Sequence, residues 1–145
     1  MHILVADDDE SNLAFLSDLL RAWGHVVTTA RDGLHALRAV RQDPDIQLAI
    51  MNWLMPQMDG LRASAAMKRL TGRNIRTVVL VGRDFCDEVH SRFPAYSDNY
   101  LAKPVDPQSL LSMLRQMGSL DRPRPVAERA LSAADAAASK SGVQG

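Results

Sequence analysis

Short apolar runs alternate with amphipathic stretches along this sequence, and the alternation limits the possible folds more than any other feature. The apolar runs cover residues 3–6, 25–30, 46–51, 77–81 and 100–102. Continuous rather than alternating hydrophobicity is typical of strands that are covered on both faces, as in parallel sheets. A strand followed by a helix, repeated five times along the chain, predicts an α/β fold. We expect a mainly parallel sheet, right-handed crossovers and helices on both faces.

The stretches between the apolar runs have apolar residues three and four positions apart, which is the spacing of an amphipathic helix. We expect helices over residues 11–23, from 34 to a point before 44, and over 61–70, 85–93 and 107–117. In the third of these helices, Leu61, Met67 and Leu70 are the positions expected to face the core.

Polar side chains stand at the ends of several predicted strands. Asp7, Asp8 and Asp9 follow the first strand, Asn52 follows the third, and Lys103 ends the fifth. An acidic run alone is most often a solvated loop, and a lone Asn at a strand end is most often a turn former. In a parallel sheet, however, the carboxyl ends of the strands meet at one rim. The joint placement therefore favours an ionic site, where a hard cation such as Mg²⁺ would compensate the adjacent carboxylates.

The composition limits the partners and the compartment. The chain has 145 residues and a formal net charge of +0, which argues against a nucleic-acid-binding surface over the whole chain. The single cysteine, Cys86, cannot form an internal disulfide, which suits a reducing compartment. The first residues do not resemble a secretory signal, and no stretch approaches the roughly 20 apolar residues that span a bilayer. We therefore expect a cytoplasmic location, without membrane or nucleic-acid partners.

Four segments combine the strand ends with distinctive motifs. They are ILVADDDESN at 3–12, ARDGLHAL at 30–37, MNWLMPQMDG at 51–60 and DNYLAKPV at 98–105. In this order and spacing they resemble the receiver domains of two-component response regulators, over residues 3–117. The resemblance implies a flavodoxin-like (βα)5 three-layer sandwich with a five-stranded parallel sheet in the order 2-1-3-4-5. It implies a receiver domain over 1–118, followed by a flexible Ala/Pro-containing tail or truncated linker over 119–145.

The resemblance also implies roles for individual residues. Asp7 and Asp8 match the acidic pair that binds Mg²⁺, and the backbone carbonyl of Leu54 matches a further metal ligand. Lys103 matches the lysine that contacts the phosphoryl group. Pro104 matches the proline whose preceding peptide is typically cis, which the small cis penalty of prolyl bonds allows.

Two positions depart from the family pattern. Asn52 stands where the phosphoacceptor aspartate is expected, and a carboxamide is a very poor nucleophile. Asn52 can still offer an oxygen to Mg²⁺, but with one fewer negative charge, so the metal affinity should fall. Gly82, with Val81 as the alternative alignment, replaces a Thr or Ser whose hydroxyl moves toward the phosphoryl group. Tyr100 matches the aromatic switch position, although an ordinary core role is equally open.

Three functions are compatible with these residues. The first is an atypical (pseudo-)receiver that binds a histidine kinase, a phosphotransfer protein or an output protein. We expect this receiver to have no enzymatic activity and to be a monomer or a weak homodimer. Its expected surface is the face of the fourth helix, fifth strand and fifth helix. The second is an ordinary Mg²⁺-dependent receiver whose native residue at position 52 is Asp, because Asp7, Asp8 and Lys103 are retained. The third and most distant is a flavodoxin-like enzyme or flavin binder, although the acids after the first strand would repel a flavin phosphate.

Overall fold

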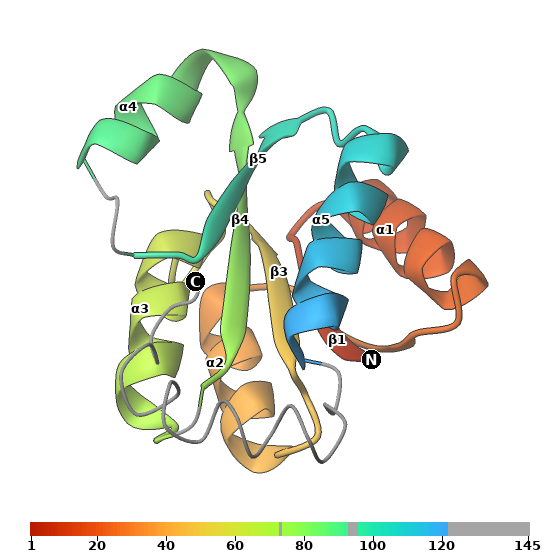
Figure 1. Ribbon diagram of the computed structural model, residues 1–145. Coiled ribbons are helices and arrows are strands. Elements are labelled where there is room, and N and C mark those ends of the chain that lie inside the picture. The colour runs from red at the N-terminus through yellow and green to blue at the C-terminus, as the bar shows by residue number, and fades with distance from the viewer. Residues whose placement is uncertain (73, 93–95, 122–145) are drawn as a thin grey trace, which may run out of the picture. The chain divides into compact units, whose positions relative to one another are not determined.

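Five parallel strands form one sheet in the order β2-β1-β3-β4-β5 in the computed structural model of the chain (Figure 1). The strands are β1 (His2–Ala6), β2 (Val26–Ala30), β3 (Leu48–Asn52), β4 (Arg76–Gly82) and β5 (Asn99–Lys103). The structure describes residues 1–72, 74–92 and 96–121. The predicted α/β class, the flavodoxin-like strand order and the parallel direction of all five strands are confirmed.

Helices follow the strands in the predicted alternation. They are α1 (Glu10–Ala22), α2 (Gly33–Gln42), α3 (Gly60–Leu70), α4 (Cys86–Arg92) and α5 (Pro107–Asp121). A short 3-10 turn, η1 (Arg83–Phe85), joins β4 to α4. The described part of α5 continues past the predicted end at residue 117.

The sheet is the middle of three layers, because α2 and α3 cover one of its faces and α1 covers the other (Figure 1). Residues of the central strands are fully buried, among them Leu4, Val5, Ala49 and Ile50. Since consecutive strand residues point to opposite faces, burial on both faces explains why these strands are continuously apolar.

Two details of the sequence prediction are wrong. The apolar run 46–51 is displaced from its strand, because Ile46 is buried in the loop before β3, which begins at Leu48. Leu70 is 48% exposed rather than inward-facing, because it is the last residue of α3, directly before the C-cap residue Thr71. Leu61 and Met67 are buried, as predicted.

The chain divides into two compact units. Met1–Leu110 contains the whole sheet, and Leu111–Gly145 forms the second unit. In the second unit the structure describes the end of α5, where Leu114 and Met117 are buried. The receiver boundary at residue 118 and the character of the tail stay predictions, and residues 122–145 lie outside the described part of the chain.

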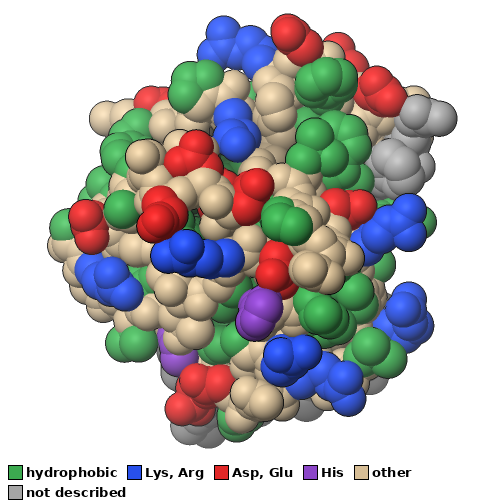
Figure 2. Space-filling view, turned by 180° about the vertical axis from the view of Figure 1, so that it is seen from behind, with side chains coloured by type: hydrophobic (Ala, Val, Ile, Leu, Met, Phe, Trp, Pro, Cys, Tyr) green, Lys and Arg blue, Asp and Glu red, His purple; other side chains and the backbone are tan. Residues whose placement is uncertain are grey.

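Charged side chains of both signs are interspersed on the face of the molecule shown in Figure 2. This mixture agrees with the equal numbers of basic and acidic residues, 17 of each. Among the described residues on this face, the blue side chains of Lys and Arg do not gather into the large basic patch that is typical of nucleic-acid-binding surfaces (Figure 2). Over the described ranges, no helix combines the length and the hydropathy needed to cross a bilayer.

Candidate functional site

Three carboxylates follow β1, and each has a different environment. Asp7 is 0% exposed, and its Oδ1 accepts a hydrogen bond from the backbone N–H of Asp9 over 2.9 Å. Its Oδ2 is buried with no hydrogen-bond partner among the described residues. Asp8 is exposed, and Asp9 is the N-cap of α1, where its Oδ1 accepts from the backbone N–H of Ser11 and Asn12. The acidic run therefore supplies two carboxylates to the rim of the sheet and one to the start of a helix.

The buried position of Asp7 is costly for its charge. Burial raises the pKa of the Asp7 carboxyl, and the negative charges of Asp8 and Asp9 act in the same direction. The hydrogen bond from Asp9 and the ammonium group of Lys103 oppose this rise, but they do not cancel it. A further cation near Asp7 would favour its ionised form.

Asn52, the last residue of β3, lies between a cation and two oxygens. Its Oδ1 accepts a hydrogen bond from Nζ of Lys103 over 2.9 Å. Its Nδ2 donates to the backbone carbonyl of Leu54 over 3.0 Å and, at the longer distance of 3.4 Å, to Oδ1 of Asp8. This orientation of the amide matches every charge around it, because the oxygen faces the ammonium group and the NH₂ group faces oxygens.

The predicted metal ligands come together, but the Asn52 amide engages two of them. Asp7 and Asp8, the Leu54 carbonyl and Asn52 Oδ1 are oxygens of the kind that Mg²⁺ prefers, and the unpartnered Oδ2 of Asp7 fits a cation. The Nδ2 group, however, points at Asp8 and at the Leu54 carbonyl. In the described ranges, no group of three or more His, Cys, Asp or Glu side chains could hold a metal. The oxygens of Asp7, Asp8 and the Leu54 carbonyl are of the type that fits Mg²⁺, although two carboxylates fall short of such a group.

Lys103, the last residue of β5, contacts Asn52 at the carboxyl end of the sheet. The register of the sheet pairs Lys103 with Gly82, the last residue of β4. The Lys103–Pro104 peptide is cis, as the resemblance implied. The structure therefore brings Asp8, Asn52 and Lys103 into one hydrogen-bonded row across β1, β3 and β5, with Gly82 beside it.

An aromatic side chain that the sequence analysis did not single out covers Gly82. A Cβ atom at Gly82 would lie 3.4 Å from Cδ2 of Phe85, which the turn η1 places over the end of β4. The rings of Phe85 and Trp53 meet edge to face, with centroids 6.0 Å apart. No sequence pattern predicts this contact, because it depends on the path of the chain through η1.

Tyr100 lies on β5 and packs, with Trp53, against the buried side chains of Leu61, Val79 and Val89. Burial raises the pKa of its phenol. The structure thus places Tyr100 in an apolar environment, which agrees with both interpretations of this residue, a switch position and a core position.

The loop from β3 to α3 holds Asn52 and Leu54 in place through a close approach at Gly60. A Cβ atom at Gly60 would collide with the backbone oxygen of Asn52. The N–H of Gly60 donates to the carbonyl of Trp53 over 2.7 Å. Asp59 is the N-cap of α3, and its side chain accepts a hydrogen bond from the backbone N–H of Arg62.

A hollow of about 640 Å³ opens beside the hydrogen-bonded row. Its lining consists of Asp8, Leu54, Met55, Gln57, Met58, Asp59 and Arg62. Gln57 has a φ of 69°, a left-handed conformation that bends the loop around this hollow. The hollow shares Asp8 and Leu54 with the candidate metal site, so that it is part of the same rim.

Known proteins with similar sequences are response regulators. A family model described as the response regulator receiver domain matches residues 3–115. The response regulator MprA of Mycobacterium leprae is 34% identical over 129 residues, which cover 88% of this chain and 55% of that protein. MprA of Mycobacterium tuberculosis is 33% identical over the same shares of both chains. The chain thus spans about half the length of the curated relatives it matches.

Several solved structures with similar folds are receiver domains. A response regulator receiver domain protein from Clostridium thermocellum has 27% identity and a TM-score of 0.71, over 79% of this chain and 91% of that chain. The receiver domain of the sensor histidine kinase PA1611 from Pseudomonas aeruginosa has 24% identity and a TM-score of 0.70, over 79% and 94%. That domain has a magnesium ion in its active site cleft. The family match over residues 3–115 and the fold together show that this chain belongs to the response regulator receiver domain family.

Proposed function

We propose that this chain is an atypical receiver module, which is not phosphorylated on Asn52 and acts in two-component or phosphorelay signalling by binding other proteins. The observation that supports the proposal is the hydrogen bonding of the Asn52 amide to Lys103 on one side and to Leu54 and Asp8 on the other. A carboxamide lacks the ionised oxygen that attacks a phosphoryl donor. In addition, its NH₂ group donates to Asp8 Oδ1 and to the Leu54 carbonyl, the oxygens that would otherwise bind a cation.

Receiver domains are generally phospho-accepting signalling modules rather than catalytic enzymes, and they interact with histidine kinases and with output or phosphotransfer proteins. For this chain we propose no catalytic activity of its own, a cytoplasmic location and a monomeric or weakly dimeric state. The proposed partner surface comprises α4, β5 and α5. Because the chain spans about half of its relatives, the partners of the whole protein belong to this proposal.

Receiver domains typically bind Mg²⁺ at the acceptor site. We propose that Asp7, Asp8 and the Leu54 carbonyl would hold it here, with lower affinity than a site with a third carboxylate. When bound, Mg²⁺ would supply positive charge against Asp7 and Asp8. The Asn52 amide lowers the need for that charge, because its N–H groups already donate to Asp8 and Leu54.

Phosphorylation with a small-molecule donor tests the proposal. The chain and its Asn52→Asp variant are incubated with acetyl phosphate and Mg²⁺, and intact masses are measured. The parent should gain no phosphoryl group. An Asn12→Asp variant, which gains a carboxylate on α1 outside the site, controls for non-specific modification. An acid-labile, hydroxylamine-sensitive adduct on the parent chain would show that the proposal is wrong.

The buried Asp7 favours a second candidate, an ordinary receiver whose native residue at position 52 is Asp. Its Oδ2 has no partner among the described residues and its pKa is raised, so that the buried carboxylate is energetically unfavourable unless a cation binds beside it. On this alternative, Asn52→Asp restores Mg²⁺-dependent phosphorylation at full rate. If the variant stays inert with acetyl phosphate and also with beryllofluoride, the alternative loses its support. No contact among the described residues favours the flavin-binding alternative.

A further inference from the structure

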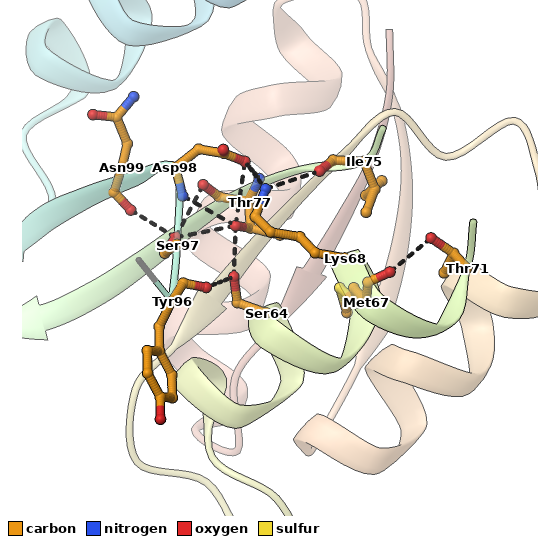
Figure 3. Close-up of polar contacts among 10 residues, drawn as sticks. All are labelled: Ser64, Met67, Lys68, Thr71, Ile75, Thr77, Tyr96, Ser97, Asp98 and Asn99. Atoms are coloured by element: carbon orange, nitrogen blue, oxygen red, sulfur yellow. Dashed lines mark hydrogen bonds and ion pairs between the residues drawn. The ribbon is translucent and has the colours of Figure 1, made fainter. Parts of the chain in front are cut away.

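A cluster of polar side chains joins α3 to the first residues of β4 and to the segment that enters β5 (Figure 3). Its members are Ser64 on α3, Thr77 on β4, and Ser97 and Asp98 just before β5; together they are called the β5 clamp. Ser64 and Thr77 are fully buried, and Ser97 is nearly so. The clamp lies at the amino-terminal ends of β4 and β5, whereas Asn52 and Lys103 lie at the carboxyl ends of β3 and β5.

Thr77 and Asp98 exchange two hydrogen bonds at the centre of the clamp. The backbone N–H of Thr77 donates to Oδ2 of Asp98 over 2.8 Å, and the backbone N–H of Asp98 donates to Oγ1 of Thr77 over 3.3 Å. The pairing of β4 with β5 begins one position later, at Val78 and Asn99. The hydrogen bonds between Thr77 and Asp98 therefore extend the pairing of β4 with β5 by one position, in the same register as the strands.

Serine hydroxyls connect this pair of residues to the strands and to α3. Ser97 Oγ lies 3.1 Å from the carbonyl oxygen of Thr77 and 3.1 Å from its Oγ1. Ser64 Oγ lies 2.6 Å from Thr77 Oγ1 and donates to the carbonyl of Tyr96. Each buried hydroxyl thus has partners, which is the condition for a buried polar group not to destabilise the fold.

The register of β5 needs such a constraint. β5 is an edge strand, in which Asn99 is exposed and the other residues are only partly buried. A strand slip of one residue turns every side chain to the opposite face, and burial on one face normally prevents it. In β5 that restraint is incomplete, so hydrogen bonds at its start have more influence than in a buried strand.

We propose that the β5 clamp sets the register of β5 and thereby places Lys103 against Asn52. Lys103 follows Asp98 by five positions on the same extended segment, and in this register its Nζ reaches Asn52 Oδ1 over 2.9 Å. A slip of one residue would turn Lys103 to the opposite face. Thr77 and Asp98 are then positioning residues, which act on the site through Lys103 without touching it. The proposal holds whether or not position 52 accepts a phosphoryl group.

Lys68 provides a matched control, because it contacts the clamp only from outside. Its Nζ lies 2.6 Å from Oδ2 of Asp98, and the two side chains are 31% and 39% exposed. Lys68→Met removes this ion pair and the 3.4 Å hydrogen bond from Nζ to the carbonyl of Ile75, but leaves both Thr77–Asp98 hydrogen bonds available. Because both side chains remain accessible to water, which weakens an ion pair, this variant should leave the register unchanged.

The test is an NMR comparison of ¹⁵N-labelled variants of the full chain. Thr77→Val removes the hydroxyl with little change of shape, and Asp98→Ala removes the carboxylate that accepts from Thr77 N–H. In both, the side-chain amide signals of Asn52 should shift. Hydrogen exchange of the β5 amides should rise by about five- to thirtyfold, the factor for one to two net hydrogen bonds. Thr77→Ser keeps the hydroxyl and should behave as the parent.

A general loss of stability must be separated from a loss of register. Val40→Ala opens a cavity under α2, away from β5, and should destabilise the domain without shifting the Asn52 amide signals. Asp98 is at the surface, so its variant provides the test even if Thr77→Val does not fold. Unchanged Asn52 signals in Asp98→Ala, or equal shifts in Val40→Ala, would overturn the proposal.

Discussion

Lys103 donates a hydrogen bond from Nζ to Oδ1 of Asn52 over 2.9 Å, and this contact determines which way the amide faces. With its oxygen held by the ammonium group, the amide turns its NH₂ group toward the Leu54 carbonyl and Asp8. An aspartate in the same place would present an oxygen to those two oxygens and would require a cation between them. The amide thus contacts Asp8 and the Leu54 carbonyl where a cation would otherwise be needed, whereas Oδ2 of Asp7 stays without a partner among the described residues.

Phe85 should shield Trp53 from solvent, because the two rings pack edge to face. In a Trp23→Phe background, which leaves Trp53 as the only tryptophan, Phe85→Ala should shift the fluorescence emission to longer wavelength and increase quenching by acrylamide. The free energy of unfolding should fall by about 0.5–1.5 kcal/mol, the usual value of such an aromatic pair. Phe15→Ala is the control, because Phe15 on α1 is 49% exposed and Phe85 is 48% exposed. A spectral shift as large in the control would contradict the assignment.

Gly60 should tolerate no side chain, because a Cβ atom would collide with the backbone oxygen of Asn52. Gly60→Ala is expected to lower the free energy of unfolding by about 1–3 kcal/mol, as for other overpacked sites. It should also shift the NMR signals of the Asn52 side chain. Gly72→Ala separates the two effects, since Gly72 has a φ of 70° but nothing near its Cβ position. That control should lose stability without a change at Asn52, and a change there would count against the steric explanation.

Asp32 should make stability depend on pH at the acid end. Burial opposes the ionisation of its carboxyl, but hydrogen bonds from the backbone N–H and the imidazole of His35, both 2.7 Å, outweigh it. The pKa of Asp32 therefore lies below its ordinary value of 3.8. A depressed acid pKa stabilises the fold above the unfolded-state pKa, and this contribution is lost as the pH falls through the folded-state value.

Asp32→Asn keeps an oxygen that can cap α2 but removes the charge. Its free energy of unfolding should be lower than that of the parent at pH 7, by roughly 0.5–1 kcal/mol. The difference should close as the pH falls below 3.8. Urea unfolding of both proteins between pH 7 and pH 3 measures it, and His35→Gln should show a part of the same effect. A difference that stays constant down to pH 3 would mean that the Asp32 charge is not its source.

The sequence was sufficient to predict the alternation of strands and helices, because burial on both faces leaves a continuous apolar signature in β1, β3 and β4. It also predicted that Asp8, Asn52 and Lys103 meet, since the carboxyl ends of parallel strands share one rim. The role of Asp9 as a helix cap could have been recognised, because an aspartate before a helical stripe is a common N-terminal signal. These features follow from local pattern and topology alone.

Other features depend on tertiary geometry and leave no local pattern. The contact between the ring of Phe85 and Gly82 depends on the turn η1, which directly follows β4. The hydrogen-bonded pair of Thr77 and Asp98 exists only in one register of β4 against β5. The orientation of the Asn52 amide likewise follows from Lys103, which is distant in the sequence.

In this account, the Asn52 amide replaces a cation at Asp8 and the Leu54 carbonyl. The direct test is to titrate the chain and its Asn52→Asp variant with Mg²⁺ and to follow the NMR signals of the residues around positions 7, 8 and 54. One added carboxylate charge within contact distance should tighten Mg²⁺ binding by about tenfold or more. The variant without Mg²⁺ should also unfold more easily than the parent. Equal Mg²⁺ affinities for the two proteins would contradict this account.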